Sequence, residues 1–240
     1  MIKTVSATDM GLKRKLNQDY VFTADCRVGN LPNLYLVADG MGGHKAGGFA
    51  SQYAVETIVE EISSKKEVDT FAALNSAIIE ANKRLRIKAA EDESMAGMGT
   101  TLVAAVIEDG ILKVANIGDS RLYLIHHGIE QITIDHSLVE EMVRLGGLDR
   151  KEARNHEKKN IITRAIGAES QIKADFFEVN LKDGDQILMC TDGVSNMLTD
   201  EEILQILKEE VGEEEKVAHL VQAANEHGGR DNMGIILISF

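Results

Sequence analysis

The chain has 240 residues, of which 44% are hydrophobic, with one proline and no tryptophan, so it can bury one substantial core. Its formal net charge of −13 argues against a general nucleic-acid binder, because binding to the phosphate backbone depends on positive charge. The first ten residues lack the apolar run of a signal peptide, and no stretch approaches the roughly 18 apolar residues of a membrane span. We therefore expect one cytoplasmic domain, 1–240, that is a monomer with no membrane or nucleic-acid partner.

The first half of the chain predicts strands, then two helices, then more strands. Alternating or continuous apolar runs predict strands at 5–8, 20–24 and 34–38, and apolar residues at three- and four-residue spacing predict helices at 48–62 and 71–89. Four strands follow at 100–107, 111–116, 121–126 and 129–133. Asp109-Gly110 and His127-Gly128 are typical turn residues and predict two hairpins between these strands.

The second half predicts an irregular, charged segment and a second group of regular elements. The segment at about 135–160 shows no clear period. Strands at 174–180 and 186–190, helices at 200–211 and 214–227, and a closing strand at 234–240 come after it. Strands grouped apart from helix pairs favour an α+β fold over a βαβ repeat. Two antiparallel sheets packed face to face with helices outside fit this order, although the order alone leaves the layering open.

Four aspartates lie in short glycine-containing loops beside the predicted strands. They are Asp39 in VADGMGG, Asp119 in NIGDSR, Asp192 in CTDG and Asp231 in GGRDN. A carboxylate at the end of a buried strand is costly unless it is paired, hydrogen-bonded or bound to a metal. Four of them predict a shared site for a hard divalent cation, because Mg²⁺ and Mn²⁺ take oxygen ligands.

Other catalytic motifs fail at specific positions. In the glycine-rich loop, Gly43 is not followed by the Lys-Ser/Thr of a P-loop, and Lys45 stands where a dinucleotide-binding motif needs its third glycine. Cys190 has Asn196 where a cysteine phosphatase needs arginine, and no GxSxG motif occurs. The two cysteines, Cys26 and Cys190, fit neither a zinc spacing nor a disulfide framework.

Near the N-terminus, GLKRKLNQDY places Arg14 and Asp19 just before a predicted strand. A planar guanidinium can hold two phosphate oxygens, so Arg14 is a candidate for binding an anionic substrate, although a solvated surface arginine is the alternative. Asp19 adds a fifth carboxylate to the candidate cation site.

Seven motifs in order resemble the type 2C metal-dependent protein phosphatases, in particular bacterial serine/threonine phosphatases of that family. They are RKLNQD, VADGMGGH, MGTTLVAAVI, ANIGDSRLYL, ITIDHS, CTDGVSNMLTDEEI and GGRDNMGIILI, and they extend from about 11 to 238. The resemblance implies a β-sandwich of two antiparallel sheets flanked by helix pairs (four layers, αββα), with a flap at about 135–160. It also implies hydrolysis of phosphoserine and phosphothreonine monoesters in proteins that a cognate kinase has phosphorylated.

The resemblance further implies a centre of two Mn²⁺ or Mg²⁺ ions, with a third, weaker site. By motif, Asp39 would bridge two metals, the Gly40 carbonyl would join the second, and Asp192 and Asp231 would complete the first. Asp19 would act through water, Asp119 with Asp192 would hold the third ion, and Arg14 would bind the substrate phosphate. A hydroxide bridging the two metals would then attack phosphorus in line, without a phosphoenzyme.

Two positions depart from the pattern of animal members. Gln18 replaces a glutamate, and Met41 replaces a histidine that is usually assigned as the general acid, so His44 becomes the candidate acid in its place. Within the flap, 150–159 carries five basic and two acidic residues, which predicts steering of acidic phosphopeptides, with a solvated helix–turn as the alternative. An inactive relative that binds phosphoproteins and a divalent-cation sensor are the competing functions.

Overall fold

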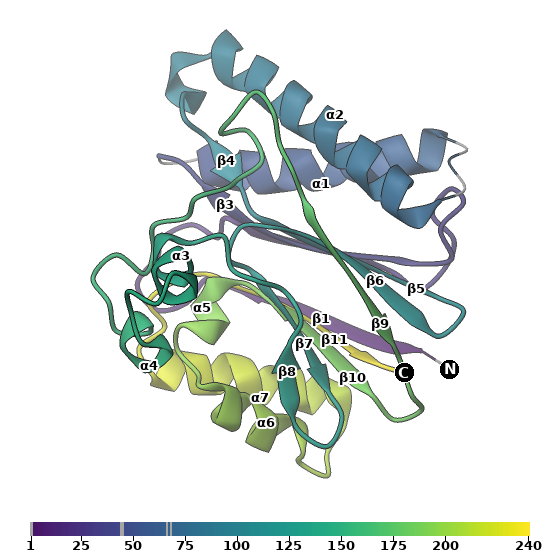
Figure 1. Cartoon of the computed structure of the whole chain (residues 1–240), viewed down its shortest axis with the longest axis vertical. Helices are drawn as coiled ribbons and strands as arrows, with labels where there is room; N and C mark the ends of the chain where they lie inside the picture. Colours follow the sequence, from purple (N-terminus) through teal and green to yellow (C-terminus); the bar gives the residue numbers. More distant parts are fainter. Residues whose placement is uncertain (1, 44–45, 66, 68) are drawn as a thin grey trace.

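The computed structural model describes residues 2–43, 46–65, 67 and 69–240. Two antiparallel sheets lie face to face, with helices on both outer sides (Figure 1). The first sheet has the order β2 (Asp19–Ala24), β3 (Leu34–Met41), β5 (Leu102–Glu108), β6 (Ile111–Ile117) and β9 (Asp175–Asn180), with the short β4 (Gly99–Thr100) on β3. The second has the order β1 (Lys3–Asp9), β11 (Met233–Ser239), β10 (Gln186–Cys190), β7 (Arg121–Ile125) and β8 (Ile129–Gln131). The predicted α+β class and four-layer sandwich are confirmed.

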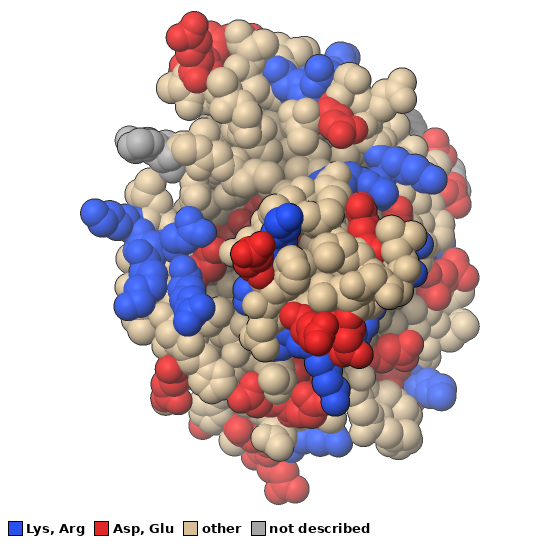
Figure 2. All heavy atoms as spheres, turned by 60° about the vertical axis from the view of Figure 1, so that its left-hand side comes forward, with Lys and Arg blue, Asp and Glu red and all other residues tan. Residues whose placement is uncertain are grey.

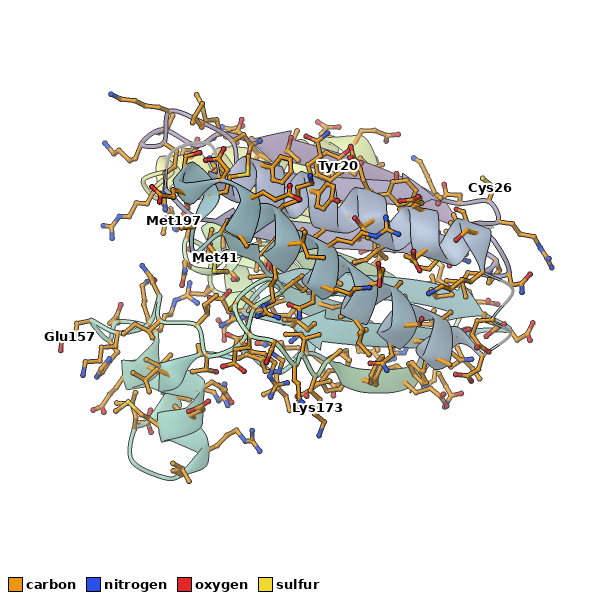
Figure 3. All side chains as sticks on the ribbon, turned by 90° about the horizontal axis from the view of Figure 1, so that it is seen from above. Tyr20, Cys26, Met41, Glu157, Lys173 and Met197 are labelled. Carbon is orange, nitrogen blue, oxygen red and sulfur yellow. The ribbon has the colours of Figure 1, made fainter. Side chains whose placement is uncertain are left out.

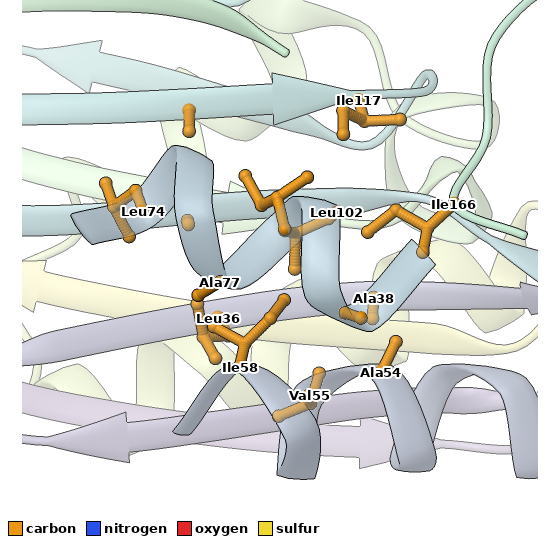
Figure 4. Packing of buried hydrophobic residues seen from close by; sticks show 14 of the residues in the cluster. Leu36, Ala38, Ala54, Val55, Ile58, Leu74, Ala77, Leu102, Ile117 and Ile166 are labelled. Carbon is orange, nitrogen blue, oxygen red and sulfur yellow. The ribbon is translucent and has the colours of Figure 1, made fainter. Parts of the chain in front are cut away.

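The first sheet is buried on both faces, which explains its almost continuous apolar strands. Side chains alternate between the two faces of a strand. Leu36 and Leu102 pack against α1 (Ala46–Ser64) and α2 (Thr70–Glu91), as Figure 4 shows, while Val37 and Val103 face the second sheet. These side chains belong to two separate buried clusters. One packs the helix pair onto the first sheet, and the other packs the second sheet onto its opposite face.

The second sheet repeats this arrangement with the later helices. Leu188 and Leu237 face α5 (Asp192–Ser195), α6 (Asp200–Leu207) and α7 (Glu213–Glu226), and Met189 and Ile236 face the first sheet. A capping box between Thr199 and Glu202 begins α6. The helix expected at 200–211 therefore begins as predicted but ends earlier, at Leu207.

Both predicted hairpins are present. In the β5–β6 turn, Asp109 and Gly110 have φ values of 52° and 76°, as a two-residue turn that matches strand twist requires. In the β7–β8 turn, the backbone N–H of His126 donates to the carbonyl of Gly128. The strand expected at 129–133 is shorter and ends at Gln131.

The segment at 135–160 is more regular than the sequence indicates. It contains α3 (Leu138–Arg144) and α4 (Arg150–Ala153), and Ser137 and Asp149 cap them at their N-termini. The irregular reading was wrong because two such short helices leave no measurable period, and local caps hold them. A single 3₁₀ turn, η1 (Glu93–Met95), follows α2. Within the described ranges, no helix has the length and apolar content to cross a bilayer.

Candidate functional site

Five aspartates meet at one end of the sandwich, because the strands that carry them begin or end there. Asp19 opens β2 and lies opposite Asp39 of β3 in the strand register. Asp192 follows β10, Asp231 precedes β11, and Asp119 lies between β6 and β7. Met41 and Met197 mark this end in Figure 3, with Glu157 of the flap across from them and Cys26 at the far end. The structure thus brings the predicted carboxylates together.

Asp39 and Gly40 are fixed by the backbone around them. The Thr101 hydroxyl accepts from the Asp39 backbone N–H at 2.9 Å, and the Thr100 hydroxyl donates to the Asp39 carbonyl at 2.9 Å. A Cβ at Gly40 would collide with the carbonyl of Gly47, so only glycine allows this approach to α1. These contacts fix the backbone of Asp39, and its side chain is half-buried.

Asp19 is the most buried of the five, at 8% exposure. The Thr191 hydroxyl donates to Asp19 Oδ2 at 2.7 Å and accepts from the Gly234 backbone N–H at 2.8 Å. Thr191 therefore fixes the Asp19 carboxylate and joins β2, β10 and β11 at the site. Sequence reasoning did not single out Thr191, although it directly precedes a candidate ligand.

Asp192 has one satisfied and one unsatisfied oxygen. Asn196 Nδ2 donates to Oδ2 at 2.9 Å, while Oδ1 is buried and has no hydrogen-bond partner among the described residues. An unpaired buried carboxylate oxygen is costly. Its position between the other aspartates makes it a natural ligand for a cation.

Asp231 joins the site to the N-terminal loop. Its Oδ2 accepts from Arg14 Nη2 at 2.6 Å, and its Oδ1 accepts from the Asn232 backbone N–H at 2.9 Å. The Asn232 side chain accepts from the Gln18 backbone N–H at 2.9 Å. Asn232, which sequence reasoning also missed, therefore holds the loop that carries Arg14 next to the carboxylates.

Asp119 lies in a loop that His136 positions. The Gly118 backbone N–H donates to His136 Nδ1 at 3.0 Å, so His136 Nε2 carries the proton and faces Asp175 at 3.2 Å. Gly118 has a φ of 101°, and a Cβ there would collide with the Thr101 side chain. Glycine is therefore required at the turn that directs Asp119 to the site.

The carboxylates perturb one another strongly. Burial, with the charges of neighbouring aspartates, raises the pKa of Asp19 to about 7, of Asp119 to about 8 and of Asp192 to about 6. Burial and the same neighbours raise the pKa of Asp39 well above its usual range. The ionised carboxylates would repel one another at this short range, and a bound divalent cation would offset that repulsion.

The donor set fits a hard cation, but the side chains are not arranged as a closed cage. Among the described residues, no three acidic, imidazole or thiol groups already form a metal-binding cluster. Arg14, Asn196 and Thr191 each donate a hydrogen bond to an oxygen of Asp231, Asp192 or Asp19. The oxygen-only donor set and the orphaned Asp192 oxygen still fit a hard cation, because side-chain rotation alone would free the other oxygens.

A cavity of about 310 Å³ opens between the carboxylates and the flap. Asp119 and Asp192 line its inner side, and Arg154 and Lys159 of the flap line its outer side. Burial and the nearby charge of Arg154 lower the pKa of Lys159. The cavity joins the cation site to a positively charged wall, as an anionic substrate requires.

The candidate general acid cannot be placed, because His44 lies outside the described residues. Met41 ends β3 beside the site and has no proton to donate. Gln18, the second departure from the animal pattern, uses its backbone carbonyl to accept from Gly40 and from the Ser51 hydroxyl.

Comparison with known proteins agrees with this geometry. Residues 13–233 match the family described as Protein phosphatase 2C. The chain is 40% identical over 238 residues to "Protein phosphatase PhpP" of Streptococcus pneumoniae, covering 97% of this chain and 95% of that protein. The solved S. agalactiae serine/threonine phosphatase is 31% identical, with a TM-score of 0.90 over 100% of this chain and 99% of that one.

A second solved structure bears on the cation site. It is the catalytic domain of the serine/threonine protein phosphatase PstP in complex with two manganese ions, 31% identical, with a TM-score of 0.87 over 99% of this chain and 97% of that one. The sandwich, the five aspartates at its end and the match over almost the whole length lead to one assignment. This chain belongs to the protein phosphatase 2C family.

Proposed function

We propose that this protein is a metal-dependent serine/threonine phosphatase that hydrolyses phosphoserine and phosphothreonine monoesters in proteins. The observation that carries this function is the convergence of Asp19, Asp39, Asp119, Asp192 and Asp231 beside Arg14. Carboxylates alone would repel a phosphate. Carboxylates with a cation and an adjacent arginine form a site that binds phosphate and neutralises its charge.

Each residue has a proposed part. Asp39 would bridge two cations, with the Gly40 carbonyl on one of them and Asp192 and Asp231 on the other. Asp119 with Asp192 would hold a third cation, and Asp19 would act through water. The cations are Mn²⁺ or Mg²⁺, since both take oxygen ligands. When bound, they lower the pKa of a water molecule and offset the charge of the phosphoryl oxygens.

The chain's own residues supply orientation. The Arg14 side chain is half exposed at 50%, so its guanidinium can reach a phosphate from its place beside Asp231. Thr191 holds Asp19 and Asn196 holds Asp192, which limits the motion of both carboxylates before substrate arrives. The cavity under the flap leaves room for residues that flank the phosphorylated side chain.

The source of the substrate and the compartment are further parts of this proposal. Phosphoserine and phosphothreonine in proteins are made by kinases that consume ATP, so we propose a cognate kinase as the source of substrate and the cytoplasm as the place of action. We also propose that 1–240 acts as one catalytic domain and as a monomer. Light scattering after size exclusion and a single calorimetric unfolding transition test these two points.

The first experiment measures hydrolysis of p-nitrophenyl phosphate and of a phosphothreonine peptide with Mn²⁺, with Mg²⁺ and with EDTA. Wild type is compared with Asp192→Ala and with Asp183→Ala, an exposed aspartate in the β9–β10 turn, as the matched control. We expect turnover of both substrates that EDTA and Asp192→Ala abolish and Asp183→Ala preserves. A folded wild type that binds the phosphopeptide without turnover under any metal would instead support an inactive phosphoprotein-binding protein.

A further inference from the structure

The loop between β1 and β2 presents an unusual mixture of side chains. Residues 10–16, which we call the basic loop, contain three basic and three large apolar residues and no acidic residue. Met10, Leu12 and Leu16 are 44%, 65% and 48% exposed, and both Lys13 and Lys15 are exposed. Exposed apolar residues gathered with like charges are typical of an interaction surface.

The basic loop is held in place by backbone contacts. The N–H groups of Leu12 and Lys13 donate to the Gly229 carbonyl at 2.8 and 3.1 Å. Asn232 Nδ2 donates to the carbonyls of Met10 and Leu16 at 2.8 and 2.9 Å. Because both ends and the middle are tied to the segment before β11, a partner that binds here would not have to order the loop, which lowers the cost of binding.

Ion pairs neutralise only part of the positive charge of this surface. Among the residues that the structure describes, the ion pair of the basic loop is that of Arg14 with Asp231, and Lys13 and Lys15 make none. Arg230, which follows Gly229, is also exposed. Its charge, together with burial and the charge of Arg154, lowers the pKa of Lys159 in the flap. Figure 2 shows Lys and Arg side chains gathered beside a hollow in which acidic side chains are visible.

The basic loop is continuous with the catalytic centre. Arg14 lies between Lys13 and Lys15 in sequence and contacts Asp231 of the centre at 2.6 Å. The loop and the flap lie at the same end of the sandwich, on opposite sides of this centre (Figures 1 and 3). A peptide whose phosphate is held by Arg14 would therefore extend over the neighbouring lysines and leucines.

We propose that the basic loop, together with Arg230, is a docking surface for an acidic segment with apolar residues next to the phosphorylated residue of a protein substrate. This inference rests on the proposed phosphatase function. Charge complementarity selects the acidic residues, and Leu12 and Leu16 would bury apolar side chains between the lysines. An anionic membrane has the same charge, but direct continuity with the phosphate-binding arginine favours a peptide that reaches the centre.

The test compares Lys13→Glu/Lys15→Glu with Arg27→Glu/Lys182→Glu, which makes the same charge change away from the site. Arg27 adjoins Cys26 at the far end of the molecule in Figure 3, and Lys182 lies in the β9–β10 turn. The substrates are a phosphothreonine peptide with acidic and leucine flanks, the same peptide with glutamine and serine flanks, and p-nitrophenyl phosphate. For the acidic peptide, we expect kcat/KM to fall about tenfold at low salt and less at high salt in the loop variant alone.

The other two substrates should change by less than about twofold, since they make no use of the lysines. Leu12→Ser/Leu16→Ser separates the apolar contribution to docking from that of the lysines. Its loss of kcat/KM on the acidic peptide should persist at high salt, because salt does not screen apolar contacts. Fluorescence anisotropy of the acidic peptide on an Asp192→Ala background measures docking without turnover. There too Lys13→Glu/Lys15→Glu should weaken binding about tenfold, so docking is tested even if the proposed hydrolysis fails.

Three results would overturn the proposal. An equal loss on all three substrates would mean that the variant disturbs the centre. Unchanged kinetics and anisotropy for the acidic peptide would mean that the lysines do not meet substrate. Cosedimentation of wild type, but not of the loop variant, with phosphatidylserine vesicles, together with unchanged peptide binding, would assign the surface to a membrane instead.

Discussion

The carboxylate centre and the rim around it are built in opposite ways. In the centre, hydrogen bonds from Thr191, Asn196 and Asn232 hold the acidic residues, and burial raises the pKa values of most of them. On the rim, the basic loop and the flap at 135–160 carry lysines and arginines that are exposed or line the cavity. From this difference we expect the chemistry to depend on the centre and the choice of substrate to depend on the rim, so that substitutions in each have separable effects.

The two halves of the rim also differ from each other. The flap at 135–160 carries six basic and six acidic side chains, and Arg150 forms a two-pronged pair with Glu140 at 2.8 and 3.0 Å. The basic loop has no acidic residue. Residues 150–159 of the flap carry a net positive charge, but the acidic residues earlier in the flap offset much of it. The stronger positive field on the rim therefore comes from the basic loop.

The largest effect should come from the centre. Asp39→Asn keeps the shape of the side chain but removes its charge, and we expect kcat to fall about 10³-fold or more on both p-nitrophenyl phosphate and the acidic peptide. Steady-state kinetics at saturating Mn²⁺ measure this. The anisotropy of the bound acidic peptide should stay within about twofold, because the rim is intact. A loss confined to the peptide would contradict the division between centre and rim.

A smaller effect should come from the residue that positions Asp19. Thr191→Val removes the hydroxyl that donates to Asp19 and accepts from Gly234, and kcat should fall about 10- to 100-fold on both substrates. Thr191→Ser keeps the hydroxyl and should retain most of the wild-type kcat. Thr133→Val is the matched control, since the Thr133 hydroxyl is also buried and accepts from a strand N–H. Equal losses in the two valine variants would indicate a packing defect only.

Repulsion in the centre should also be visible in stability. The pKa values of Asp19, Asp119 and Asp192, about 7, 8 and 6, lie above the ordinary 3.8, so the folded protein binds more protons than the unfolded chain between these limits. The free energy of unfolding in EDTA should therefore be highest near pH 4 and fall as pH rises from there to about 8, the highest of the three raised pKa values. Saturating Mn²⁺ should flatten this dependence.

Asp119→Asn tests the source of the repulsion. In EDTA it should raise the Tm by about 2 to 8 °C at pH 8 and by less at pH 5, because the cost of keeping the wild-type carboxyl protonated in the fold grows as pH rises from the ordinary pKa of 3.8 to the raised one of about 8. Asp183→Asn, in an exposed turn, should change neither value. Differential scanning fluorimetry measures both. A Tm that rises with pH in the metal-free wild type would show that the carboxylates are held by compensating charges instead.

The sequence predicts the strands of the core well, because burial on both faces makes their apolar runs almost continuous. Leu34 to Ala38 and Gln186 to Cys190 are examples, and each run leads to a candidate ligand. From the residues alone, however, the aspartates indicate only a shared cation site. Their individual roles came from the family resemblance and stay predictions.

Other features of the site depend on contacts between distant segments. Asn232 bonds to the carbonyls of Met10 and Leu16, which are more than two hundred positions away in sequence. Thr191 likewise reaches Asp19 from another sheet. No local period or motif encodes such contacts, so sequence reasoning missed both residues and did not single out the lysines on either side of Arg14.

The smallest expected effect belongs to the flap. Lys158 is exposed, Lys159 is half-buried in the cavity, and Lys158→Glu/Lys159→Glu should lower kcat/KM about threefold for the acidic peptide and less for p-nitrophenyl phosphate. The fall should be smaller than for Lys13→Glu/Lys15→Glu, because nearby acidic residues already weaken the field of the flap. Equal losses on both substrates, or none, would remove steering by the flap. A fall larger than that of the loop variant would reverse the proposed order of the two halves of the rim.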